Sequence, residues 1–129
     1  MSSPRVEFVR RVFEAAERGG PRAGVALLPE EVTWRPFRGG GRVLRSRAEL
    51  DMFYAEIERE GGRFEPYPTV YEEEGDCVVV SGSARLYSGS SGFKESSLVW
   101  VFTFEDDRLV AQCSYATRAE ARAAIRAVA

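Results

Sequence analysis

Hydrophobic positions recur at helical spacing in two segments, and each segment is bounded by residues that begin and end helices. The first starts at Ser3 and Pro4, a cap followed by an N1 proline, and stops at the Gly-Gly-Pro of 19–21. Its apolar residues are Val6, Val9, Val12, Phe13 and Ala16. The second starts at a capping box, Ser46 with Glu49, and stops at the two glycines of 61–62. Its apolar face is Leu50, Phe53, Tyr54 and Ile57. The pattern predicts two amphipathic helices.

β-branched and aromatic residues in short runs predict five strands, over 32–35, 64–71, 77–87, 97–104 and 109–115. Charged or glycine-rich stretches at 72–76, 88–92 and 105–108 separate the last four and are typical of turns. Thr117 and Glu120 form another capping box, so a short helix should close the chain. Residues 22–28 favour one or two helical turns, and the glycine-rich 38–42 favours a loop at a pocket rim. We therefore expect a single α+β domain over 1–129.

Composition narrows the choice of partner and compartment. The 129 residues have a formal charge of −2 with both signs interspersed, which gives no field that attracts nucleic acid or an anionic membrane. No apolar run is long enough to span a bilayer, and the start of the chain does not resemble a signal peptide. Cys77 and Cys113 fall in separate predicted strands, which favours free buried thiols. We expect a soluble cytoplasmic protein with no nucleic-acid or membrane partner.

The chain has no histidine, which removes the most common general base and zinc ligand. The acidic run 72–74 is a weak metal candidate, because adjacent carboxylates in a strand point to opposite faces. We expect no metal and no cofactor.

Several segments, in this order and spacing, resemble the SnoaL-like branch of the nuclear transport factor 2-like superfamily. They are 9–16 with 19–20, 32–36, 53–54, 74–80 and the final hairpin with 117–121. The resemblance implies a cystatin-like α+β cone, in which a curved, mostly antiparallel sheet wraps around the N-terminal helices and a short helix ends the chain. It also implies a homodimer through the outer sheet face, where Arg85 and Tyr87 would lie.

The catalytic residues of related families are not matched. The position of the ketosteroid isomerase base is Arg35, and those of its oxyanion-hole tyrosine and aspartic acid are Val12 and Trp100. The catalytic positions of limonene epoxide hydrolases fall near Gly82, Ala84 and Ser114. SnoaL-like cyclases rely on an aspartate with a nearby histidine, which this chain lacks. The resemblance therefore implies a fold but no known activity.

If the resemblance fixes the phase of the strands, one set of alternating side chains faces the cone. The predicted ligand-binding residues are Arg35, Tyr54, Leu98, Trp100, Phe102, Gln112 and Ser114, with Ala84 and Leu86 beside them. A guanidinium in an apolar cone needs an anionic partner, either a ligand carboxylate or Glu95. Alternatively, Arg35 bends to the rim and is solvated.

Three functions remain open. The cone binds a small, mostly apolar molecule, with an anionic group as one option and Arg35 as its anchor. Alternatively, an isomerase, hydrolase or cyclase uses a non-standard acid–base set, with Tyr54 as acid and Asp51 or Glu95 as base. In the third, side chains fill the cone and the dimeric surface carries the function.

Overall fold

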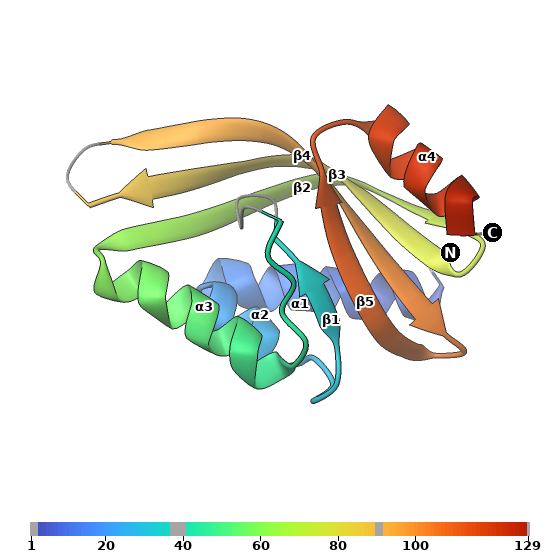
Figure 1. Cartoon of the computed structure of the whole chain (residues 1–129), viewed down its shortest axis with the longest axis horizontal. Coiled ribbons are helices and arrows are strands. Elements are labelled where there is room, and N and C mark those ends of the chain that lie inside the picture. The colour runs from blue at the N-terminus through green and yellow to red at the C-terminus, as the bar shows by residue number, and fades with distance from the viewer. Residues whose placement is uncertain (1–2, 37–40, 90–91, 129) are drawn as a thin grey trace.

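One curved sheet carries three helices on its concave side and a fourth helix on its outer side (Figure 1). A computed structural model describes residues 3–36, 41–89 and 92–128. The helices are α1 (Pro4–Gly19), α2 (Pro21–Val25), α3 (Arg47–Arg59) and α4 (Arg118–Val128). The strands are β1 (Thr33–Arg35), β2 (Gly62–Glu74), β3 (Cys77–Ser88), β4 (Phe93–Glu105) and β5 (Arg108–Tyr115).

The strands form a five-stranded sheet in the order β1-β5-β4-β3-β2. All neighbours are antiparallel except β1, which pairs with β5 in parallel at the edge of the sheet. The prediction of an α+β fold with a curved, mostly antiparallel sheet is thus confirmed.

The predicted helix caps are present at three helices. The hydroxyl of Ser3 accepts from Val6 N at 3.1 Å, and that of Ser46 accepts from Glu49 N at 3.1 Å. At α4, Thr117 Oγ1 accepts from the backbone N–H of Glu120 at 3.1 Å. Each bond satisfies one of the donors that the first turn of a helix leaves unpaired.

The sheet bends where β2 and β3 change register, between Pro68 and Val70. Gly82 lies opposite Pro68, and a Cβ atom on Gly82 would lie 2.2 Å from the carbonyl oxygen of Tyr67. Only glycine permits so close an approach of two backbones. The irregularity bends the strand and increases its twist, which favours closure of the sheet into a cone.

The prediction of a turn over 72–76 is partly wrong, because 72–74 belong to β2 and only the following residues turn. The alternation of the strand sends Glu72 and Glu74 toward α4, where they pair with Arg118 and Arg122, the latter at 3.3 Å. The charges therefore join the sheet to the C-terminal helix. Most of the loop predicted over 38–42 lies outside the described residues.

Buried side chains form two layers, one on each side of the sheet. The larger layer lies between α1–α3 and the concave face, with Val9, Leu50, Val78, Val80 and Phe102 at its centre. The smaller lies under α4 and contains Cys77, Val79, Val99, Val101 and Ala121. Over the residues that the structure describes, no helix is long and apolar enough to cross a membrane.

Candidate functional site

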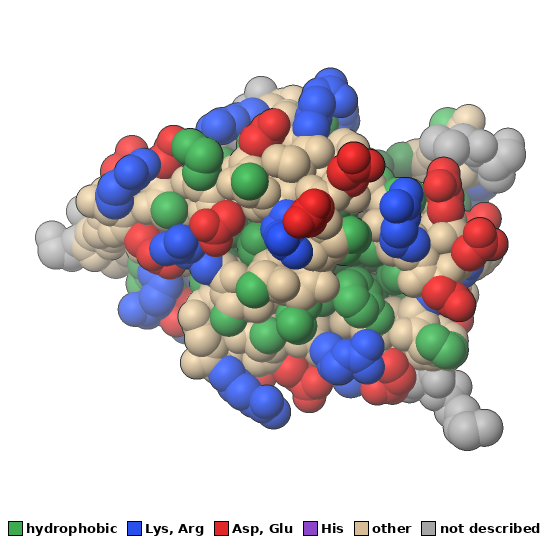
Figure 2. Space-filling view, turned by 90° about the horizontal axis from the view of Figure 1, so that it is seen from below, with side chains coloured by type: hydrophobic (Ala, Val, Ile, Leu, Met, Phe, Trp, Pro, Cys, Tyr) green, Lys and Arg blue, Asp and Glu red, His purple; other side chains and the backbone are tan. Residues whose placement is uncertain are grey.

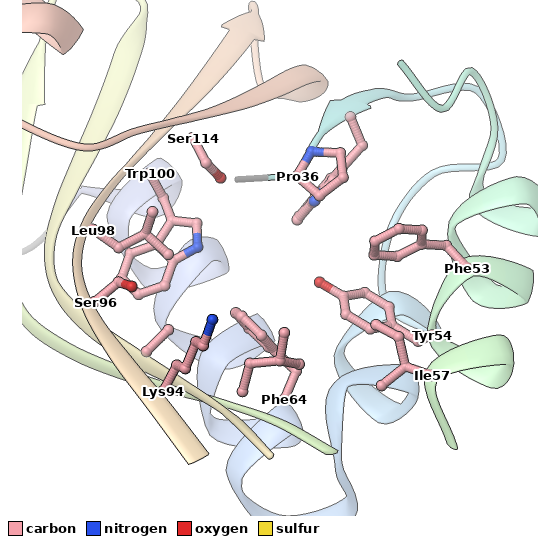
Figure 3. Close-up of a pocket in the computed structure, with 13 residues that line it drawn as sticks. Pro36, Phe53, Tyr54, Ile57, Phe64, Lys94, Ser96, Leu98, Trp100 and Ser114 are labelled. Carbon is pink, nitrogen blue, oxygen red and sulfur yellow. The ribbon is translucent and has the colours of Figure 1, made fainter. Parts of the chain in front are cut away.

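The wide end of the cone contains a cavity of about 200 Å³ between the sheet and α3 (Figure 3). Most of its wall is apolar. The described lining residues are Trp34, Pro36, Phe53, Tyr54, Ile57, Phe64, Ala84, Leu86, Lys94, Ser96, Leu98, Trp100 and Ser114. A smaller space of about 40 Å³ continues toward the narrow end, where Phe13 and Phe102 line it.

Every second residue of β4 contributes to the sheet side of the cavity, namely Lys94, Ser96, Leu98 and Trp100. This spacing follows from the period of two in a strand. Burial deepens along the row: Lys94 is exposed, Ser96 is half-buried and Leu98 and Trp100 are buried. The row therefore runs from the mouth of the cavity to its floor.

Neighbouring strands complete the sheet side through their pairing with β4. Leu86 lies opposite Lys94, Ala84 opposite Ser96, and Ser114 opposite Trp100. Because directly opposed residues share one face, these side chains join the wall that β4 begins.

The opposite wall comes from α3, on which Phe53, Tyr54 and Ile57 are spaced to share one face. The Tyr54 hydroxyl points into the cavity (Figure 3) and has no hydrogen-bond partner among the described residues. Burial raises the pKa of Tyr54 above its ordinary value. The hydroxyl thus stays protonated near neutral pH and can donate.

Two more donors face the same space from the sheet. The Trp100 indole nitrogen points toward the cavity (Figure 3), and within the described ranges no acceptor bonds it. Ser114 Oγ accepts from Gln112 Nε2 at 3.0 Å, which leaves the serine hydrogen free to donate. Gln112 Oε1 is itself buried without a partner in the described part of the chain.

The charge of the cavity wall is one-sided. Lys94 is the only lysine of the sequence, and the described lining residues include no aspartate, glutamate or cysteine. Nor do the described Cys, Asp and Glu side chains form a group of three or more that could hold a metal ion. Among the residues that the structure describes, the wall therefore offers donors and one cation but no obvious general base.

No protein-family model and no curated protein matches this sequence. Solved structures do match. An NTF2-like protein of unknown function from Burkholderia pseudomallei is 24% identical, with a TM-score of 0.75 over 93% of this chain and 95% of that one. TerC, co-crystallised with polyporic acid, is 21% identical, with a TM-score of 0.73 over 94% and 97%. The chain has the nuclear transport factor 2-like fold. An LEH-like epoxide hydrolase from M. tuberculosis shares this NTF2-like fold at 15% identity and a TM-score of 0.70, over 87% of this chain and 81% of that one.

The NTF2-like cone contains four of the predicted site residues in its cavity wall: Tyr54, Leu98, Trp100 and Ser114. Ala84 and Leu86 also lie where they were expected. Phe102 is displaced inward and lines only the smaller space. Gln112 faces the concave side but is 1% exposed and reaches the cavity only through Ser114. Ligand binding by these residues stays a prediction.

The predicted place of Arg35 in the wall is wrong. In β1 the buried residue is Trp34, while Thr33 and Arg35 on either side are exposed. The alternation of a strand puts the indole inside and the guanidinium outside. Sequence alone carried this signal, since Val32 and Trp34 are apolar and Thr33 and Arg35 are polar.

Both carboxylates considered as bases are engaged elsewhere. Asp51 accepts from Arg22 Nε at 2.9 Å, and this hydrogen bond lowers the pKa of Asp51. Glu95 accepts from Arg85 Nε at 2.9 Å on the outer face of the sheet, so it is not the partner of Arg35. Neither lines the cavity.

Sequence reasoning missed several lining residues. Phe53 and Ile57 were predicted only as part of the apolar face of a helix, and Lys94 and Ser96 precede the range predicted for their strand. The others are Trp34, Pro36 and Phe64. Extending the period of two backward from Trp100 would have found Lys94 and Ser96.

Tyr54 is expected to ionise well above the ordinary tyrosine pKa of about 10. A raised folded-state pKa adds stability that is present below pH ~10 and is lost as the pH rises toward the folded-state value. Absorbance titration of wild type and Tyr54→Phe, taken as a difference, isolates this group from the other tyrosines. A difference curve with its midpoint near pH 10 would contradict burial of the hydroxyl.

Proposed function

We propose that the cavity binds a small, mostly apolar molecule that carries a hydrogen-bond acceptor. The observation that carries the proposal is the convergence of three donors on one apolar space, those of Tyr54, Trp100 and Ser114. A donor that faces an apolar cavity without a protein partner gains a hydrogen bond when a ligand supplies an acceptor, and one such bond contributes about 0.5–1.5 kcal/mol. A carbonyl, ether or hydroxyl oxygen of a ligand would supply the missing acceptor.

The volume limits the size of the ligand. Drug-sized molecules occupy pockets of about 300–1,000 Å³, whereas an engineered cavity of about 150 Å³ admits benzene. At about 200 Å³, the cavity suits one ring with a short substituent. Phe64, Leu98 and Trp100 would contact the ring.

Binding accounts for the wall better than the two alternatives do. A non-standard enzyme needs a base, and Asp51 and Glu95 both form ion pairs away from the cavity. A cone filled by its own side chains would leave no space of about 200 Å³. TerC, a structurally similar protein, was co-crystallised with polyporic acid, an organic molecule.

Both tryptophans of the chain, Trp34 and Trp100, line the cavity, so intrinsic fluorescence should report its occupation. We expect cyclohexyl methyl ketone, a neutral one-ring acceptor, to change the emission in a saturable way and to raise the melting temperature. At one hundred times its dissociation constant the ligand adds about 2.7 kcal/mol. Tyr54→Phe should weaken binding by about 2- to 10-fold, the range expected for one neutral hydrogen bond.

Ala84→Leu is the blocking variant, because Ala84 is buried in the wall and a larger side chain there would occupy the space. The neighbouring Ser83→Ala is its control, since Ser83 does not line the cavity. Equal saturable binding by wild type and Ala84→Leu would show that the ketone binds elsewhere. If the ketone changes neither the fluorescence nor the melting temperature of the wild type, the proposal is wrong.

We also propose that two copies of the chain associate through the outer face of β2–β4. Tyr67 and Phe93 are 39% and 49% exposed there, which is high for aromatic side chains. The guanidinium of Arg85 lies 5.3 Å and 4.6 Å from their ring centroids and holds the rings in one surface. A two-fold interface needs such a self-complementary patch.

Sedimentation velocity tests the assembly at micromolar concentration. We expect the wild type to be a dimer and Phe93→Glu to be a monomer, because the variant places a charge in the apolar patch. Met52→Glu is the matched control: Met52 is 61% exposed but lies on α3, on the opposite side of the sheet, and the variant should remain a dimer. A monomeric wild type would contradict the proposal.

A further inference from the structure

Lys94 marks the mouth of the cavity. It begins the inward row of β4 and is exposed, whereas Trp100 at the other end of that row is 5% exposed. Its ammonium group points toward the space between the lining side chains (Figure 3). The only lysine of the chain therefore stands between the cavity and solvent.

The positive charge of Lys94 is not balanced within the described structure. The neighbouring Glu95 points to the opposite face and bonds to Arg85 at 2.9 Å. At the same end of the sheet, Arg63 is paired with Glu65 at 2.8 Å. Lys94 forms no ion pair with any described residue, and no described carboxylate lines the cavity. The charges near this end are otherwise interspersed with both signs (Figure 2).

We propose that the ligand is a one-ring carboxylic acid whose carboxylate binds the Lys94 ammonium at the mouth and whose ring occupies the apolar interior. This rests on the proposed function, since it names the class of molecule that the same cavity takes. A carboxylate at the floor would lose its hydration among apolar side chains, whereas at the mouth it keeps water and gains a counter-ion. The flexible lysine stem lets the charge follow acids of different length.

The orientation of the ligand follows from the change along the wall, from exposed Lys94 at one end to buried Trp100 at the other. The ring enters first and contacts Leu98 and Trp100, and the acid group remains level with Lys94 and Leu86, which are opposite one another in the sheet. An oxygen substituent on the far side of the ring would meet the donors of Tyr54 and Ser114. An aromatic or alicyclic acid with a hydroxyl or keto substituent could bind Lys94 through its carboxylate and the donors of Tyr54 and Ser114 through its other oxygen.

Calorimetric titrations with phenylacetate and the matched neutral phenylacetamide test the inference at low ionic strength. We expect the wild type to prefer the acid by about 1.4- to 5-fold, the range for an ion pair at an exposed group, and added salt to reduce that preference. Lys94→Met should bind the two compounds with similar affinity, so that the preference for the acid is lost. Arg63→Met is the control, since it removes a paired cation at the same end of the sheet, and it should keep the preference.

The outcomes separate this inference from the proposed function. If the wild type binds acid and amide equally, or if Lys94→Met keeps the preference, the role of Lys94 is overturned while cavity binding stands. If neither the acid nor the amide binds the wild type, both proposals fail.

Amine acetylation followed by mass spectrometry provides a second readout. Because no other lysine exists, every modified side-chain amine is Lys94, and the α-amine is an internal reference. Phenylacetate should slow acetylation of Lys94 at least twofold in the wild type without affecting the α-amine. It should not do so in Ala84→Leu, whose cavity is filled. Equal protection in both variants would overturn the inference.

Discussion

The packing of Phe13 against Trp100 and Phe102 divides the interior of the cone into a filled part and an open part. The ring of Phe13 lies edge-on at 5.0 Å from Trp100 and 5.8 Å from Phe102, and Tyr71 adds a third contact at 6.1 Å. Edge-to-face pairs at these distances add about 0.5–1.5 kcal/mol each beyond the area that they bury. This cluster closes the narrow end and holds Trp100 in place as the floor of the cavity. At the wide end, α3 contributes side chains that do not reach across, so space remains.

The same alternation that builds the core decides what chemistry faces that space. Period-two patterning identified Leu98, Trp100 and Ser114 correctly, because β4 and β5 are long and their apolar positions are consistent. The error at Arg35 came from matching a family position in a three-residue strand, where the local alternation of apolar and polar residues carried more information. The helices and their caps were predictable because cap and stop residues act within one turn.

Lys94 and Ser96 were harder to predict. Lys94, Glu95 and Ser96 have little intrinsic strand preference, and pairing with β3 extends the strand through them. The cavity itself could not be predicted, since its volume depends on how far apart α3 and the sheet lie. Sequence patterns specify which face of an element is apolar. The space that remains between facing side chains depends on how the elements pack.

The described wall of the cavity combines hydrogen-bond donors with one cation. Tyr54, Trp100 and Ser114 present donors, Lys94 presents a cation, and no described lining residue is an obvious base. The raised pKa of Tyr54 keeps its hydroxyl neutral, which suits a hydrogen-bond donor. Unpaired polar groups such as Gln112 Oε1 reduce stability, and proteins tolerate such groups most often near functional sites.

The most direct test of binding inside the cone is a proton–nitrogen correlation spectrum recorded during titration with cyclohexyl methyl ketone. The chain gives two indole N–H signals, from Trp34 and Trp100, and both side chains line the cavity. We predict that both signals shift with one common dissociation constant, while the side-chain N–H signal of Arg85 on the outer face stays in place. Stationary indole signals alongside shifts on the outer face would contradict the assignment of the cavity as the binding site.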